Sequence, residues 1–110
     1  MANLTKVLAQ AFAPTTAGQI YAVPSAKHAY VKAITLVNVD STAHWVKLWV
    51  NGTTDAFLIL PQRTLGAGES ADGDGLITLA ANGVINAQAD ALSKIAVAVM
   101  GLEMDGAGPA

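Results

Sequence analysis

The residues best suited to acid–base chemistry in this chain are two histidines and the acidic residues near them. Asp40, Ser41 and His44 supply the residue types of a nucleophilic triad, in which a base activates a hydroxyl and an acid orients the base. All three lie in one expected turn, where they cannot readily reach the mutual geometry of a triad. His28 stands at the start of an expected strand. Turn capping is the simpler interpretation of Asp40, Ser41 and His44. We expect no catalytic residue and no enzyme activity.

A second candidate for chemistry is the run Asp72-Gly73-Asp74-Gly75, which resembles the front of a calcium loop. An EF-hand loop needs a bidentate Glu near its end, where this chain has Gly83. A solvated turn therefore explains the run better. The sequence Asn51-Gly52-Thr53 fits a glycosylation acceptor, but a hairpin turn explains it more simply. No phosphate-binding glycine loop occurs, so we expect neither a metal nor a cofactor.

Composition favours an assembled protein and excludes several partner classes. Hydrophobic residues make up 53% of the 110 residues and charged residues only 13%, which is a poor surface for a free monomer. The absence of cysteine excludes disulfides and thiolate metal sites. Six scattered basic residues and a net charge of −2 argue against nucleic acid as a partner. The longest apolar segment near the C-terminus, Ile95–Leu102, is too short to cross a membrane, and we expect synthesis in a cytoplasm.

The elements that would position these residues are organised around His28–Leu60. Residues 29–39 are apolar on both parities, which predicts a strand buried on both sides. In the next run, Val46, Leu48 and Val50 share one face, while the opposite face carries two tryptophans and a lysine. Asn51-Gly52 predicts a tight type I′ hairpin, with Ala56–Leu60 as the partner strand that Pro61 ends.

The remaining segments complete an all-β pattern. Shorter strands are predicted at Gln19–Val23, Leu76–Leu79, Val84–Ala89 and Lys94–Leu102, with a polar, glycine-rich stretch from Gln62 to Gly75. Turn signals recur about every 8 to 12 residues, which is typical of a sandwich or barrel. The sequence therefore predicts an all-β fold: a single antiparallel β-sandwich or jelly roll of about 7–8 short strands.

The first segment allows two interpretations. Residues 3–12 fit the apolar stripe of a helix, yet Leu4, Leu8 and Phe12 could also line one face of a strand. We favour an extended N-terminal arm that adds to a sheet. The chain is then divided into an arm at residues 1–13, a β-sandwich domain at 14–104 and a flexible C-terminal tail at 105–110.

The outer face of the second long strand allows three uses. Trp45 and Trp49, with Lys47 between them, could pack on the second sheet or under a loop. They could anchor a protein interface, where tryptophan is favoured. They could also form an aromatic platform for sugar rings, for which Lys47 and Asn51 would supply polar groups.

Several short motifs in order resemble the small β-sandwich virion proteins of tailed bacteriophages. The motifs are Lys6–Gln10, Ile20–Pro24, Val31–Asn38, Leu65–Glu69, Leu79–Ile85 and Met100–Glu103. Each motif is weak by itself, and their order and spacing over nearly the whole chain carry the likeness. The tryptophan pair matches none of the shared motifs.

The resemblance implies a virion structural protein without catalysis, either a capsid decoration (cement) protein or a tail or head-fibre module. We expect a decoration protein on the capsid surface, assembled in the host cytoplasm as a homotrimer, with the major capsid protein or other virion proteins as partners. A carbohydrate-binding or fibre module for host attachment is the alternative. The candidate interface residues are Leu4, Val7, Leu8, Phe12, Trp45, Lys47 and Trp49.

Overall fold

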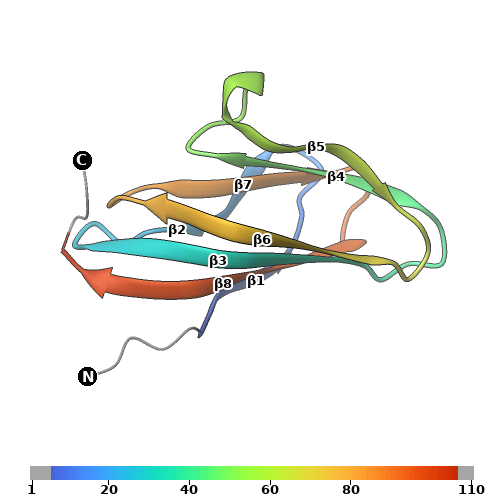
Figure 1. Ribbon diagram of the computed structural model, residues 1–110. Coiled ribbons are helices and arrows are strands. Elements are labelled where there is room, and N and C mark those ends of the chain that lie inside the picture. Colours follow the sequence, from blue (N-terminus) through green and yellow to red (C-terminus); the bar gives the residue numbers. More distant parts are fainter. Residues whose placement is uncertain (1–5, 107–110) are drawn as a thin grey trace.

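Two four-stranded antiparallel sheets pack face to face in the computed structural model, which describes residues 6–106 (Figure 1). Over these residues the chain forms eight strands and one 3-10 turn. The elements are β1 Lys6–Phe12, β2 Gly18–Ala22, β3 Lys27–Asn38, β4 His44–Val50, η1 Asp55–Phe57, β5 Leu58–Leu65, β6 Ser70–Leu79, β7 Val84–Ala89 and β8 Ile95–Asp105. The predicted all-β sandwich is confirmed.

The strand order is that of a jelly roll. The first sheet runs β1-β8-β3-β6 and the second β2-β7-β4-β5, so nearly every connection crosses from one sheet to the other. Among the described residues, β1 pairs only with β8, in register from Lys6 opposite Gly101 to Phe12 opposite Ala96. Both sheets therefore depend on pairings between segments far apart in the sequence.

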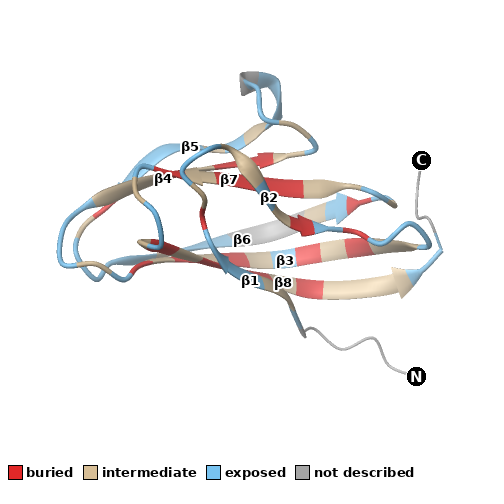
Figure 2. Cartoon of the chain, turned by 180° about the vertical axis from the view of Figure 1, so that it is seen from behind, coloured by how far each residue is buried: buried red, intermediate tan, exposed pale blue. Residues whose placement is uncertain are grey.

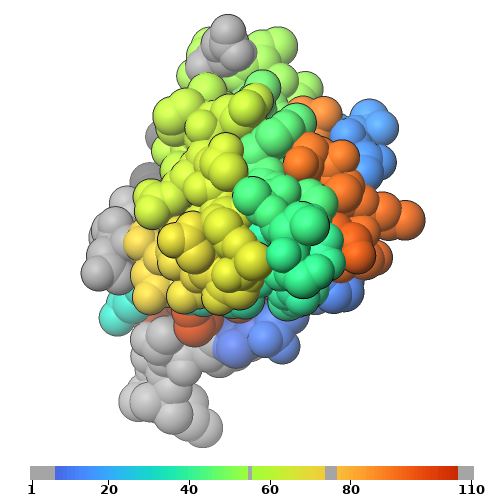
Figure 3. All heavy atoms as spheres, turned by 90° about the vertical axis from the view of Figure 1, so that its right-hand side faces the viewer, coloured from blue at the N-terminus to red at the C-terminus, as the bar shows by residue number. Residues whose placement is uncertain are grey.

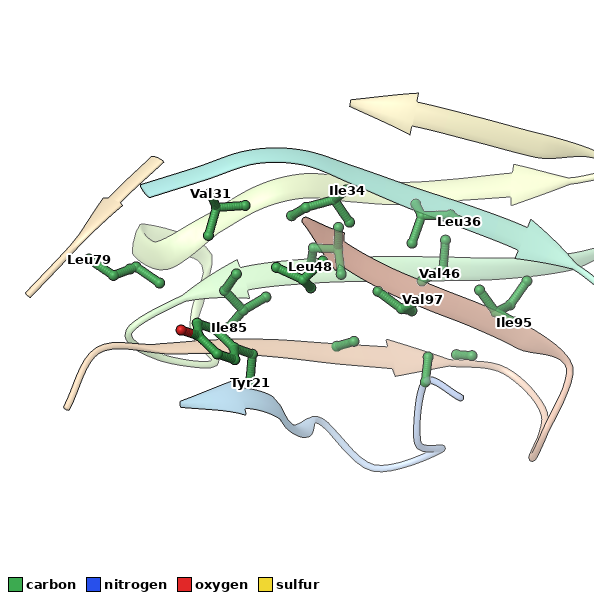
Figure 4. Packing of buried hydrophobic residues seen from close by; sticks show 14 of the residues in the cluster. Tyr21, Val31, Ile34, Leu36, Val46, Leu48, Leu79, Ile85, Ile95 and Val97 are labelled. Carbon is green, nitrogen blue, oxygen red and sulfur yellow. The ribbon is translucent and has the colours of Figure 1, made fainter. Parts of the chain in front are cut away.

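The core lies between the two sheets and is made almost wholly of aliphatic side chains. Figure 2 shows the buried positions alternating along the strands, and Figure 4 shows side chains of β3 pointing toward those of β4. From the first sheet come Ala29, Val31, Ile34, Leu36, Leu79, Ile95, Val97 and Val99. From the second come Tyr21, Val46, Leu48, Leu65, Ile85, Ala87 and Ala89. Burial of these apolar side chains is the main stabilising contribution to the sandwich.

The prediction that β3 is buried on both faces was wrong, because a β-bulge changes its parity. Ala29 and Val31 are buried before the bulge and Ile34 and Leu36 after it, while most residues between them are partly exposed. The register with β8 shifts between Val31 and Ala33. A bulge places one extra residue in a strand and reverses which face the following side chains occupy. The apolar residues of the two parities thus face the same core, one set before the bulge and the other set after it.

The predicted type I′ hairpin was also wrong. Asn51 has a positive φ of 62°, but residues 51–57 form a longer connection that contains the 3-10 turn. The partner strand β5 continues through Pro61 to Leu65. Proline is tolerated because β5 is the edge strand of its sheet and the register with β4 shifts between Leu48 and Val46.

The glycine–aspartate run forms a strand and not the predicted turn. Residues 72–75 lie within β6, the edge strand of the first sheet, and Asp72 and Gly73 pair with Thr35 and Ile34 of β3. Of the predicted strands, Val84–Ala89 has the bounds of β7. The turn expected at residues 80–83 is present, with Asn82 at a φ of 67°.

The two ends of the described chain belong to the first sheet. Residues 6–12 are a strand at its edge, whereas the helix that was the other interpretation is not formed there. The last strand extends through Asp105, beyond the position where the sequence placed the end of the sandwich domain. No helix within residues 6–106 has the length and apolarity required to cross a membrane.

Candidate interaction surfaces

The outer face of the first sheet carries small apolar side chains at its centre, on β8. On β8, large and small residues alternate: Ile95, Val97 and Val99 fill the core, whereas Ala96 and Ala98 lie outward and partly exposed. A shallow hollow lies on this face, and six of the residues that line it are outward-facing residues of three strands: Gln10, Phe12, Thr35, Val37, Ala96 and Ala98. We call these six residues the alanine face. Such a surface is well suited to close contact with another apolar surface.

The candidate residues of the first segment fall on different sides of β1. Val7 is 50% exposed and Phe12 48% exposed. Leu8 is partly buried and packs against the core, because β1 has a register shift between Val7 and Ala9. Leu4 lies outside the described residues. The structure therefore brings Phe12, but not Leu8, to the alanine face.

The tryptophan-bearing face of β4 is partly covered by the chain itself. Trp49 is only 4% exposed and lies outside the core between the sheets. Its register partner is Asn86, whose side-chain amide donates to the carbonyl oxygen of Gly52 at 2.8 Å. Residues 51–57, which rise from this sheet in Figure 1, are therefore held against the outer face beside Trp49.

Only one of the two rings remains partly exposed. Trp45 is of intermediate exposure, and the Lys47 ammonium lies 5.6 Å from its ring centroid. Because Trp49 is buried in the protomer, the structure forms no platform of two exposed rings. The indole Nε1–H of Trp49 is also buried and has no hydrogen-bond partner among the described residues.

One end of the sandwich is tied together by a buried asparagine. Figure 3 looks onto this end, where the turn after β3 lies between the turns β5–β6 and β7–β8. The side-chain amide of Asn38, 0% exposed, donates to the carbonyl oxygens of Thr42, Leu65 and Gly66 at 2.8, 2.9 and 3.1 Å. Its Oδ1 accepts from the Asp40 backbone N–H at 2.9 Å. Asn38 thus fixes two turns to each other.

The same end carries a charged cluster centred on His44. Its Nε2 lies 2.7 Å from Asp40 and its Nδ1 lies 3.0 Å from Asp90, which belongs to the turn after β7. A ring with both nitrogens bonded to carboxylates is the doubly protonated imidazolium. Lys94 lies 3.7 Å from Asp40 and completes the cluster. The hydroxyl beside the ring is that of Thr42, whose Oγ1 lies 3.2 Å from Nε2 and donates to Asp40 at 3.0 Å, and not that of Ser41.

These contacts shift two pKa values in opposite directions. The hydrogen bond to Asp40, followed by that to Asp90, raises the pKa of His44 above 6.5, although partial burial opposes the shift. The bond to His44, followed by bonds from the Ser41 backbone and the Thr42 hydroxyl, holds the pKa of Asp40 well below 3.8. At the opposite end, burial and a 2.5 Å bond to Glu103 raise the pKa of the Tyr21 hydroxyl.

We expect the stabilisation from His44 to depend on pH. Since its folded-state pKa is raised, its contribution is complete below pH 6.5 and is lost as pH rises through the folded-state value. The contribution of Asp40 is complete above pH 3.8 and declines only in stronger acid. The melting temperature of wild type should therefore exceed that of His44→Gln at pH 5 to 6 by more than it does at pH 9.

Asp90→Asn is the matched control, because it keeps the shape of the Nδ1 partner and removes one charge. Its pH dependence should be weaker than that of wild type, and NMR titration should give a lower pKa for His44. An equal stability difference between wild type and His44→Gln across this pH range would contradict the assignment of imidazolium.

This chain is similar to known proteins in its fold and not in its sequence. Neither protein-family profiles nor curated protein sequences give a match to this chain. A chain of the acid-stable capsid of Helicobacter pylori bacteriophage KHP30 is similar in structure, with a TM-score of 0.59 and 14% identity over 96% of both chains. A chain from the disulfide-linked pili of Bacillus endospore appendages has a TM-score of 0.49 at 15% identity, covering 93% of this chain and 87% of that chain.

A third similar structure, infectious bursal disease virus strain Gx, matches with a TM-score of 0.48 and 7% identity, covering 97% of this chain but 33% of that chain. At 14% identity, the likeness to the phage capsid chain shows a shared fold and no more. The expected virion-type β-sandwich thus has a fold also present in a phage capsid.

The sequence interpretation missed the alanine face. Its signal was present in Ile95–Val99, where branched residues and alanines alternate, but alanine was counted there only as part of an apolar run. The outward position of Val37 could not be read from the sequence, because it depends on the bulge in β3.

Proposed function

We propose that this chain is a structural protein of a bacteriophage particle, a decoration protein that binds the outside of the capsid shell and stabilises it. The observation that carries the proposal is the alanine face, an uncharged apolar surface across three strands of one sheet. The shared fold with a phage capsid chain and the resemblance of the motifs to small virion proteins support it.

The alanine face is suited to such a contact for a physical reason. Small side chains on β8 leave a flat floor, and Phe12 at 48% exposure stands beside it as an apolar projection. Burying this surface against the shell would stabilise only the assembled state, since the free protein gains nothing from it. We propose self-association as a homotrimer on the capsid lattice, with the major capsid protein as partner.

The proposal predicts that a charge placed on the alanine face prevents attachment. Ala98 lies opposite Gln10 and Thr35 on the neighbouring strands, so Ala98→Glu can extend into solvent without disturbing the core. We expect co-sedimentation with decoration-free, expanded capsids of the cognate phage to be weakened about 100-fold, because a buried unpaired charge costs several kcal/mol.

Gln62→Glu, an exposed change on β5 of the other sheet, is the matched control and should bind as wild type does. Bound wild-type protein should also raise the temperature at which the capsids disassemble. If wild-type protein neither sediments with the capsids nor raises that temperature, the proposed function is wrong.

A further inference from the structure

The open side of the sandwich holds an apolar slot between the two sheets. The slot has a volume of about 320 Å³ and lies between the edge strands β5 and β6. Its floor consists of core side chains, among them Val31, Ile34, Leu36 and Leu48, each no more than 6% exposed. The slot therefore extends down to the hydrophobic core at this flank.

On β6 the slot is bordered by Ala71 and Gly73, which have little or no side chain, and by Ile77. Ala71 and Gly73 lie opposite Leu36 and Ile34, whose side chains fill the core. A Cβ atom built on Gly73 would meet only the Ile34 carbonyl oxygen within 4 Å, at 3.8 Å, and Gly73 does not have a positive φ. Neither the backbone nor close packing requires glycine at this position. Glycine in a strand costs stability, and here its effect is to leave the slot open.

The rim of the slot is charged on both sides. Arg63 lies on the β5 side. Asp72 lies on the β6 side, with its side chain toward the outer face of the first sheet like that of its register partner Thr35, and both residues are exposed. Within the described part of the chain neither takes part in an ion pair. An occupant with an apolar centre, an acidic group toward β5 and a basic group toward β6 would complement this rim.

An extended peptide meets these requirements together. The outer edge of β6 has no strand partner among the described residues, so its backbone N–H and C=O groups can pair with an added strand. A strand added there alternates its side chains, so a residue opposite Gly73 directs its side chain into the slot and the residues beside it direct theirs to the outer face, where Asp72 lies.

We propose that the slot receives a large aliphatic side chain from an extended segment of the major capsid protein, which adds as a strand to the free edge of β6. This inference rests on the proposed function and names a second contact with the shell, on the flank of the sandwich. A side chain of this protein that fills the slot should therefore block the contact with the capsid protein.

Gly73→Leu is the variant that tests it. The new side chain enters the slot, so the melting temperature should stay equal to that of wild type or rise, while binding is lost. Thr78→Leu adds the same side chain to β6 at an exposed position outside the slot and is the matched control. Arg63→Glu reverses the charge on the rim without touching the core.

The first measurement uses the dye 1-anilinonaphthalene-8-sulfonate, an apolar probe with one negative charge that Arg63 can attract. Its fluorescence should rise with wild type and with Thr78→Leu, whereas its affinity for Gly73→Leu should fall about tenfold or more. Equal dye binding by wild type and Gly73→Leu would overturn the slot as a binding site.

The second measurement identifies the partner. Overlapping immobilised peptides that cover the sequence of the major capsid protein are probed with each variant. Wild type and Thr78→Leu should bind a peptide of alternating apolar residues, and Gly73→Leu and Arg63→Glu should bind it about tenfold more weakly. If no peptide distinguishes wild type from Gly73→Leu, the proposed partner is wrong.

Co-sedimentation with decoration-free capsids separates this inference from the proposed function. Loss of binding by Gly73→Leu, with binding kept by Thr78→Leu, supports both. If Gly73→Leu sediments with capsids as wild type does, the slot contact is overturned and the decoration role stands. If wild type fails to sediment with the capsids, both the decoration role and the capsid protein as partner are wrong.

Discussion

Gly101→Ala is expected to destabilise the protein by about 3 kcal/mol or more, a large part of the stability of a domain this size. Gly101 is buried in β8, and a Cβ there would overlap the carbonyl group of Tyr30 and come within 2.9 Å of the Val31 Cα. These are backbone atoms of β3, which cannot move aside as the end of a flexible side chain could. The strand pairing itself would have to open.

The bulges explain why the backbones are so close at this point. β3 and β1 each shift register against β8 beside Met100, between Val31 and Ala33 and between Val7 and Ala9. Both neighbours of β8 are thus irregular at the same level. Urea unfolding followed by tryptophan fluorescence would measure the loss, since Trp49 is buried in the folded protein.

Gly73→Ala is the matched control for that experiment. The same methyl group is added to another strand of the same sheet, but its nearest heavy atom within 4 Å is a carbonyl oxygen at 3.8 Å. The free energy of unfolding should therefore stay equal or rise slightly, because alanine restricts the unfolded chain more than glycine does. Equal stability of Gly101→Ala and wild type would mean that the close approach at β3 is not present in solution.

Asn38→Ala is expected to reduce the free energy of unfolding by about 3 kcal/mol. The change removes the amide donor from the buried carbonyl oxygen of Leu65 and the part-buried ones of Thr42 and Gly66. It also removes the acceptor of the Asp40 backbone N–H. A buried polar group that loses its partner costs about 1–3 kcal/mol. The loss should appear in the urea midpoint with little change in the slope of the transition.

Asn38→Asp distinguishes hydrogen bonding from packing. Aspartate keeps the shape and the acceptor for Asp40, but it replaces the amide donor with a second oxygen that faces the carbonyl groups. We expect it to destabilise at least as much as alanine does at neutral pH. If Asn38→Asp were as stable as wild type, the amide donor would not be what connects the turns.

The sequence was most informative where local signals agree with the fold. The alternation in β4 predicted that Val46 and Leu48 face the core, and Ala80–Gly83 predicted a turn. It was least informative where a neighbouring strand decides the outcome. Nothing local marks the bulge in β3 or shows that Asp72–Gly75 runs along an edge, because both depend on pairing with distant residues.

The candidate surfaces follow the same division. Phe12 could be proposed from the sequence and is exposed, whereas Trp49 was proposed and is buried beside a connection that the Asn51-Gly52 signal had suggested was shorter. The slot was not predicted at all, because a glycine that leaves space looks the same in a sequence as a glycine that makes a turn. Only the register of β6 against β3 separates the two.

The pairing of the first strand with the last has a consequence for biosynthesis. β8 lies between β1 and β3, so an inner position of the first sheet is filled by the last of the eight described strands. Until then β1 has no strand partner and β3 has one free edge. The sandwich can close only after β8 has been synthesised, and until then the unpaired edges of β1 and β3 are open to aggregation.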